Sequence, residues 1–196
     1  MIDPGAFSFI EGTVSVKDIG PVDAILLSHE HSDHYFPEAL KAFCAMKPTK
    51  IIAPKWLAPK LKEEGLTCQV IEEGDTLKAA GFSIEAFESA HERLPSQGPG
   101  HLGFMINSKL FYPGDSFSIQ SVENCEAMAL PISGPFLTLV DALEYAHLIG
   151  PTKVIPVHDG ILKDFYLERI HHQCKEYLAE KEIEFLPLKL SESIEI

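Results

Sequence analysis

Three histidines and an aspartate fall within six consecutive residues, in the pattern H-x-H-x-D-H at residues 29–34. An apolar run of strand length, residues 22–27, comes directly before this cluster. A helical pattern begins soon after it at Pro37, a residue favoured at the first position of a helix. The sequence therefore predicts a loop, between the end of a strand and the start of a helix, that carries four polar side chains close together.

The residue types in this loop are those that bind metals. Imidazole and carboxylate groups are the ligands that Zn²⁺ and similar ions prefer. His29 and His31 are two residues apart, so in an extended segment they point to the same side, whereas Asp33 and His34 belong to the turn into the helix. One catalytic zinc keeps an open position and takes about three protein ligands. Four ligands in one loop predict either two metals, or one metal and a catalytic carboxylate.

Further ligands are expected at the ends of later strands. His91, Asp115 and His158 each follow an apolar segment of strand length, and polar residues in such loops often carry function. A single histidine after a strand, or an aspartate in a Pro-Gly-Asp turn, is ordinary loop chemistry on its own. The seven candidate ligands together indicate a metal site more strongly than any one of them does alone. They are His29, His31, Asp33, His34, His91, Asp115 and His158.

Four of the nine histidines remain outside this set. His147, His171 and His172 fall in predicted helices, and we interpret them as structural or solvent-exposed residues. His101, in the segment GPGHLGF, is a weaker candidate for the lining of a pocket.

The order of the predicted elements is mixed, with β-hairpins between helices. This order favours an α/β sandwich with sheets inside and helices outside, formed as a single domain over residues 1–196. Predicted helices cover Pro37–Met46 and residues 55–64, 138–149 and 162–179. Predicted strands cover residues 22–27, 50–53, 68–71, 76–79, 82–87, 102–107, 109–112, 127–131, 154–157 and 182–186.

Composition narrows the classes of partner. The net charge of −13 repels phosphate backbones, so no nucleic-acid partner is expected. No apolar run approaches the roughly 18 residues of a membrane span, and no signal peptide is visible. The four cysteines are scattered, which favours small buried apolar residues over a zinc ribbon or a disulfide framework. Together these features predict a cytoplasmic protein that acts on a small molecule.

The candidate ligands, in this order, resemble the metal motifs of the metallo-β-lactamase superfamily. The match comprises H-x-H-x-D-H at residues 29–34, then SAH ending at His91, GD at Asp115 and VH at His158. The segment IDPG at residues 2–5 is similar to the strand-ending Asp motif of the family. The segment LPISGPFLTLVDALEYA resembles the branch that contains the ascorbate-6-phosphate lactonase.

The resemblance implies a four-layer αββα sandwich of two mixed sheets flanked by helices. It assigns His29, His31 and His91 to one metal. It assigns Asp33, His34 and His158 to the second metal, with Asp115 bridging the two. Two divalent ions are expected as cofactors, with zinc favoured and manganese or iron as alternatives.

The start of the chain departs from the family pattern. In that branch, strands and a glycine-containing segment precede the IDPG motif, whereas here Met1 stands directly before Ile2. We therefore expect an edge of the first sheet to lack its usual partner strand. Homo-oligomerisation is one way in which such an edge would be covered.

These observations predict a dinuclear hydrolase. A hydroxide bridging the two metals would attack an ester, lactone or phosphodiester bond, with Asp33 and Asp115 as catalytic carboxylates. Asp159, beside His158, is a candidate partner for that ligand, and the loop at Ser133 and Gly134 is a candidate substrate contact. Two alternatives remain open: a non-haem iron oxidoreductase on the same fold, and a truncated, inactive metal-binding domain.

Overall fold

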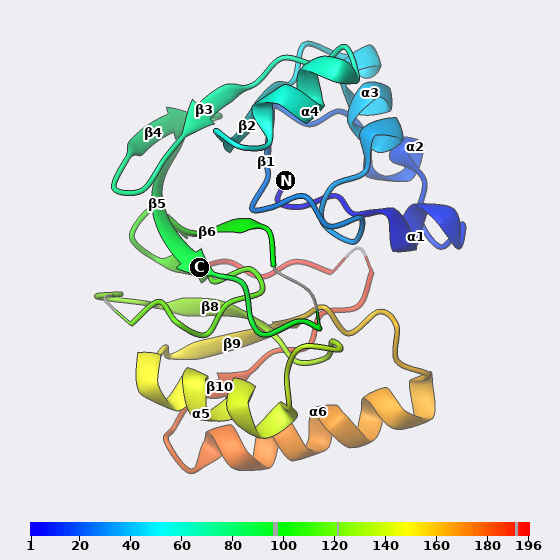
Figure 1. The fold of residues 1–196 in the computed structure, drawn as a ribbon. Coiled ribbons are helices and arrows are strands. Elements are labelled where there is room, and N and C mark those ends of the chain that lie inside the picture. Colours follow the sequence, from blue (N-terminus) through cyan, green and yellow to red (C-terminus); the bar gives the residue numbers. More distant parts are fainter. Residues whose placement is uncertain (96–97, 121, 191) are drawn as a thin grey trace. The chain divides into compact units, whose positions relative to one another are not determined.

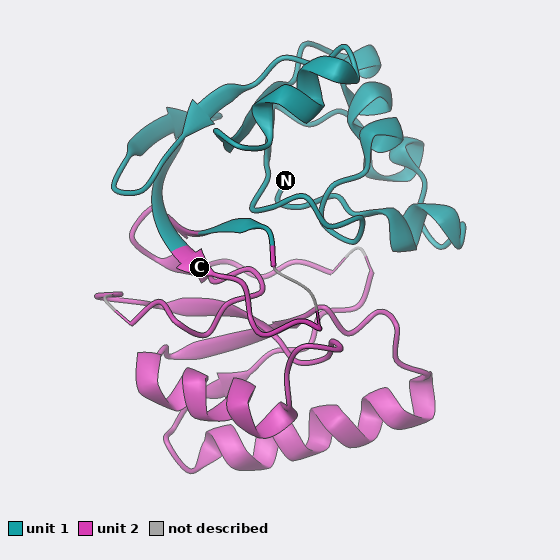
Figure 2. Ribbon diagram, in the orientation of Figure 1, with its two compact units in different colours: residues 1–88, 99–102 teal, residues 89–98, 103–196 magenta. Residues whose placement is uncertain are grey.

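The structure is a computed structural model that describes residues 1–95, 98–120, 122–190 and 192–196. The chain forms two compact units, which Figure 2 shows in different colours. Unit 1 comprises Met1–Glu88 and Pro99–Leu102, and unit 2 comprises Ser89–Gly98 and Gly103–Ile196. In the part of the chain that the structure describes, no helix combines the length and the apolar character needed to cross a membrane.

Unit 1 contains a three-stranded parallel sheet with the strand order β1-β2-β3. Helices connect its strands, because parallel neighbours need a crossover. The core beneath the helices is formed by aliphatic residues of the strands, among them Ile25 and Ile51, and by Leu40, Phe43 and Leu61 of the helices. In chain order the elements are β1 (Ala24–Leu26), α3 (Pro37–Met46), β2 (Lys50–Pro54), α4 (Ala58–Glu63) and β3 (Gln69–Ile71).

The first residues of the chain line the free side of β1. The backbone N–H of Asp3 donates to the carbonyl of Leu26 over 2.9 Å, and the N–H of Leu26 donates to Met1 over 3.0 Å. Ile2 forms a parallel bridge with Leu26. The edge that we expected to lack a partner is therefore paired over these few residues.

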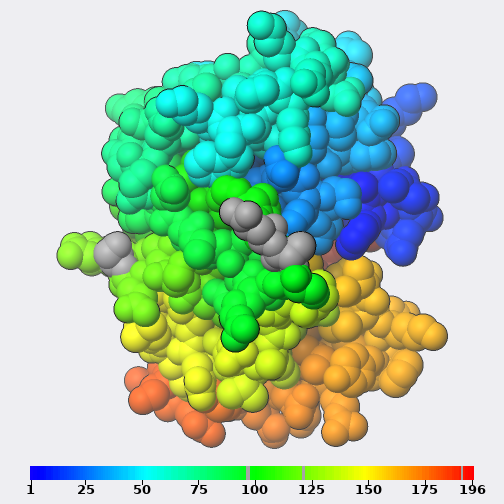
Figure 3. All heavy atoms as spheres, in the orientation of Figure 1, coloured from blue at the N-terminus to red at the C-terminus, as the bar shows by residue number. Residues whose placement is uncertain are grey.

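Two short helices follow that the sequence patterns did not indicate, α1 (Ala6–Ile10) and α2 (Val16–Ile19). Each has no more than five residues, too few for a periodic apolar pattern to be read. α1 lies at the surface, in dark blue in Figure 3, and the side chain of Ile10 is 70% exposed. α2 begins at a capping box made by Ser15 and Asp18.

The second sheet has seven strands in the order β10-β9-β8-β7-β6-β5-β4. It is mixed, because β4 pairs antiparallel with β5 and β6 antiparallel with β7, whereas β7, β8, β9 and β10 are parallel. Its strands are β4 (Thr76–Ala79), β5 (Phe82–Ala90), β6 (Gly100–Ile106), β7 (Leu110–Tyr112), β8 (Ala127–Pro131), β9 (Lys153–Val157) and β10 (Glu184–Phe185).

Two helices belong to unit 2, α5 (Leu139–Ile149) and α6 (Asp164–Ala179), and they lie side by side in Figure 1. The predicted capping box of α5 is present, since the Thr138 side chain accepts from the N–H of Asp141. The helix ends at Gly150, whose left-handed backbone is favourable for glycine.

The predicted α/β fold with two sheets and flanking helices is confirmed. Element boundaries differ in one place that matters for the site. β5 continues to Ala90, three residues beyond its predicted end, so that His91 follows the strand directly. The candidate ligands therefore lie in the loops that follow β1, β5, β7 and β9.

Candidate metal centre

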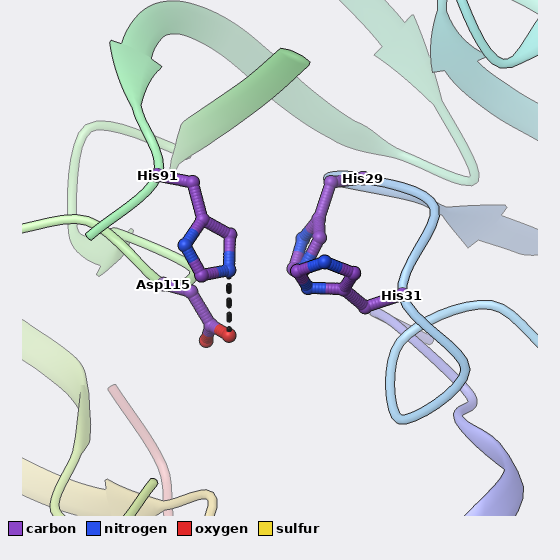
Figure 4. A group of neighbouring side chains, drawn as sticks. All are labelled: His29, His31, His91 and Asp115. Atoms are coloured by element: carbon purple, nitrogen blue, oxygen red, sulfur yellow. Dashed lines mark hydrogen bonds and ion pairs between the residues drawn. The ribbon is translucent and has the colours of Figure 1, made fainter. Parts of the chain in front are cut away.

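In unit 1, the loop after β1 turns back on itself and gathers its histidines. The carbonyl of His31 accepts from the N–H groups of His34, over 2.9 Å, and Tyr35, over 2.8 Å. The ring centroids of His29 and His31 are 4.7 Å apart, and those of His29 and His34 are 4.1 Å apart. Nε2 of His29 lies 3.0 Å from Nδ1 of His31, and Figure 4 shows these two rings close together. Asp33 is half-buried in the same loop.

Asp3 orients two of these rings. Its carboxylate accepts from the N–H and the hydroxyl of Ser28, and its Oδ2 lies 2.9 Å from Nδ1 of His34. The Ser28 oxygen lies 2.9 Å from Nδ1 of His29. Because the Ser28 hydroxyl donates to Asp3, that oxygen accepts from the His29 ring. Nδ1 of both rings therefore carries the proton, which leaves Nε2 as the ligand atom, the arrangement that carboxylates impose on metal-binding histidines.

These side chains of unit 1 are deeply buried. His29 is 0% exposed and His34 3% exposed. Donor atoms of Asp3, His29 and His34 lie within 4.8 Å of one another, a spacing at which they could hold a metal ion.

In unit 2, Asp115 lies beside two histidine rings. Its Oδ2 is 3.4 Å from Nε2 of His91, the contact drawn as a dashed line in Figure 4. The same oxygen is 3.7 Å from Nε2 of His158. Asp115 is 1% exposed, and its backbone carbonyl accepts from the N–H of Glu92 over 2.8 Å. Nδ1 of His91 donates to the Glu92 carbonyl over 2.7 Å, so that Nε2 is the atom aimed at Asp115.

These separations fit a shared metal better than a hydrogen bond. N–H···O bonds in proteins measure about 2.7–3.2 Å, and both Nε2–Oδ2 distances are longer, at 3.4 and 3.7 Å. Two ligand atoms that are each about 2.1 Å from a tetrahedral zinc stand about 3.4 Å apart. Asp115 therefore has the spacing of a carboxylate that shares a metal with each histidine, and the residues present fit the ions that the sequence predicts.

Two residues outside the predicted ligand set contact these ligands: His101, a weaker candidate for the lining of a pocket, and Phe136, which the sequence did not single out. The ring of His101 is fully buried at a centroid distance of 5.1 Å from His29. The ring of Phe136 lies 5.2 Å from His91 and 5.6 Å from His158, edge to face with both. Phe136 lies two residues after Gly134, in the loop whose Ser133 and Gly134 the sequence indicated as a candidate substrate contact.

Asp159 has a different partner from the one the sequence suggested. Its Oδ2 lies 2.9 Å from Nε2 of His171, a residue of α6 that the sequence pattern indicated to be structural or exposed. The neighbouring His172 is exposed and faces Glu176 one turn along the helix. His147 stacks on Tyr177 at 4.6 Å, which agrees with a structural role.

The two buried cysteines offer no competing nucleophile. Cys125 and Cys174 are buried, while Cys44 and Cys68 are partly buried, and all four are free thiols. Burial raises the pKa of Cys125 to about 11 and the pKa of Cys174 to about 12. Thiols with such pKa values are inert at neutral pH.

Comparison with known proteins places the chain in a family. The model of the beta-lactamase superfamily domain matches residues 1–158. A UPF0173 metal-dependent hydrolase of Thermoplasma volcanium is 30% identical over 172 residues, which cover 81% of this chain and 74% of the relative. A UPF0173 protein of Pyrococcus furiosus is 29% identical over 188 residues, which cover 91% of this chain and 85% of the relative.

A solved structure supports the fold. The crystal structure of a protein assigned as a metal-dependent hydrolase from Parabacteroides distasonis superposes with a TM-score of 0.67 at 23% identity. The superposition covers 95% of this chain and 82% of that protein. The family match over residues 1–158 and the 30% identity to the Thermoplasma volcanium relative show that the chain belongs to the metallo-β-lactamase superfamily, in the family of UPF0173 metal-dependent hydrolases.

Proposed function

We propose that this chain is a dinuclear metal-dependent hydrolase of small molecules. His29, His31 and His91 would hold one ion, Asp33, His34 and His158 would hold the second, and Asp115 would bridge them. The observation that carries the proposal is the position of Asp115 Oδ2, at 3.4 and 3.7 Å from Nε2 of His91 and His158. The family model runs through both units, which supports residues 1–196 acting as one domain.

Each residue has a defined task in this proposal. When bound, two divalent ions supply Lewis acidity and an activated water at neutral pH. Asp115 contributes a buried negative charge that offsets the charge of the ions. Asp33 accepts the proton of the attacking water, because a half-buried carboxylate in the loop can pass it on to solvent. Asp3 and Ser28 hold His34 and His29 in the tautomer with a ligating Nε2.

The metal requirement is testable with the purified chain. We expect about two ions per chain by elemental analysis, with zinc the first choice over manganese and iron. A strong chelator should abolish hydrolysis, and the metal should restore it. A panel of chromogenic esters, lactones and phosphodiesters would identify the bond, and its lactone members test the lactonase-like branch. Less than one ion per chain after reconstitution would contradict the proposal, as would unchanged turnover after chelation.

Phe136 indicates the kind of substrate. Its ring touches both His91 and His158, and its side chain remains partly exposed. The glycine at position 134 leaves room for the Phe136 ring, because a Cβ at that position would lie only 2.7 Å from the ring. The segment 133–137 carries no charged residue. We therefore propose that an apolar acyl or alkyl group of the substrate packs against Phe136 beside the bond that is cleaved.

Replacing Phe136 by alanine should weaken the preference for apolar substrates. Each methylene that packs on the ring contributes about 0.8 kcal/mol at most, or about fourfold in kcat/KM. In an ester series of increasing acyl length, kcat/KM should rise for the wild type and stay nearly flat for Phe136→Ala. Phe136→Leu should keep an intermediate slope. An unchanged slope in Phe136→Ala, at unchanged metal content, would rule out this contact.

A further inference from the structure

The backbone at His158 adopts an uncommon conformation. Its φ is 64°, in the left-handed region that residues other than glycine rarely occupy. Such a conformation persists only where contacts of the surrounding structure hold it in place. On the N-terminal side, Val157 is fixed in the sheet, because β9 pairs with β8 and the carbonyl of Val157 accepts from Ile132 over 3.1 Å. The residue that follows His158 is held as well.

That residue is Asp159, and it is held by α6. Its carboxylate Oδ2 lies 2.9 Å from Nε2 of His171, and the side chains are only 23% and 22% exposed. A carboxylate oxygen accepts, so the ring N–H of His171 donates. The backbone carbonyl of Asp159 also accepts from the N–H of Leu162 over 2.9 Å. Asp159 is thus tied through both its side chain and its main chain.

The His171 ring is itself fixed in place. α6 buries Ile170, Cys174 and Leu178 on the side that faces the rest of unit 2, and His171 lies next to this row. The ring of Phe185, in β10, packs edge to face against His171 at a centroid distance of 5.5 Å. His171 therefore offers a rigid donor, whereas His172 is exposed and has no part in this contact.

We propose that His171 is a positioning residue for the metal centre. Its hydrogen bond to Asp159 fixes the left-handed backbone at His158 and thereby holds Nε2 of His158 at its 3.7 Å distance from Asp115. This inference rests on the proposed function, since it gives His158 the role of a ligand of the second ion. It means that His171, which lies on α6 thirteen residues after His158, helps to set the affinity for that ion.

The first test measures the affinity for the second ion in two neighbouring variants. His171→Ala should weaken binding of the second ion about tenfold, the lower end of the loss seen when direct partners of metal ligands are removed, because His171 acts on His158 through Asp159. His172→Ala, its matched control, should bind as the wild type does. His171→Gln places an amide donor near the position of Nε2 and should recover most of the loss. Wild-type affinity in a folded His171→Ala would overturn the proposal.

A second variant covers the case in which His171→Ala fails to fold. Asp159→Ala removes the same hydrogen bond from the other partner and should cause the same loss. In the double variant the loss should be no greater than in either single variant. Additive losses would show that the two side chains act separately and would overturn the proposal.

Hydrogen exchange separates this inference from the proposed function. In metal-free protein, the amide of Leu162 should exchange faster in His171→Ala than in His172→Ala, because its acceptor belongs to Asp159. This result requires no bound ion. If the wild type binds no metal, the proposed function fails, and the exchange rates still decide whether His171 holds the segment. Equal exchange in both variants would remove the positioning role.

Discussion

Asp115→Asn should lose at least about 10³-fold in kcat/KM and should bind the two ions weakly. Asparagine keeps the size of the side chain but removes the charge that faces Nε2 of both His91 and His158, at 3.4 and 3.7 Å. Asp115 is 1% exposed, so water cannot replace that charge. A loss of several kcal/mol of charge stabilisation in the transition state lowers kcat/KM about a thousandfold, because each 1.36 kcal/mol changes the rate about tenfold.

The control for this variant is another aspartate of unit 2. Asp141→Asn alters the capping box of α5, where the carboxylate accepts from the Thr138 hydroxyl over 2.6 Å at an exposed site. It should lower stability by about 1 kcal/mol or less and leave turnover unchanged. Steady-state kinetics and elemental analysis on both variants give the comparison. If Asp115→Asn kept two ions and a tenth of wild-type activity, Asp115 would not be the bridging ligand.

The sequence predicted best where local signals were strong. Pro37 at the first position of α3 and the Thr138 capping box of α5 gave helix starts that the structure confirms. The apolar run before Ser28 likewise predicted a strand that ends before the histidine loop. The observed strand, β1 at Ala24–Leu26, is shorter than the predicted range of residues 22–27 but lies within it. These features depend on neighbouring residues, which is why one sequence is enough to find them.

Partners from distant parts of the chain could not be predicted in the same way. Asp3 and His34 are 31 residues apart, and Asp159 and His171 are 12 apart on different elements. No local pattern distinguishes His171 from the exposed His172 beside it; only the packing of α6 on β10 does so. For the same reason the sequence indicated Ser133 and Gly134 as a loop near the substrate but did not identify Phe136 as a neighbour of His91 and His158.

Gly5→Ala should destabilise the histidine loop even though Gly5 has an ordinary backbone. Gly5 precedes α1 with φ of −73° and ψ of 171°, which alanine adopts without strain. A Cβ at this position, however, would overlap the backbone carbonyl of Asp33. The two segments are drawn close by the N–H of Ala6, which donates to the Ser32 carbonyl over 2.6 Å. A backbone obstacle cannot rotate away, so the loop after His31 must shift.

The expected cost of Gly5→Ala is about 3 kcal/mol, at the upper end for overpacking, which corresponds to a Tm lower by about 6–12 °C. Metal affinity should fall as well, because Asp33 and His34 move with the displaced carbonyl. Gly160→Ala is the matched control, since a Cβ there meets nothing within 4 Å and should change the Tm by less than about 2 °C. Thermal unfolding with and without metal measures both effects. A Gly5→Ala protein as stable and as tightly metal-bound as Gly160→Ala would show that the IDPG segment does not support the histidine loop.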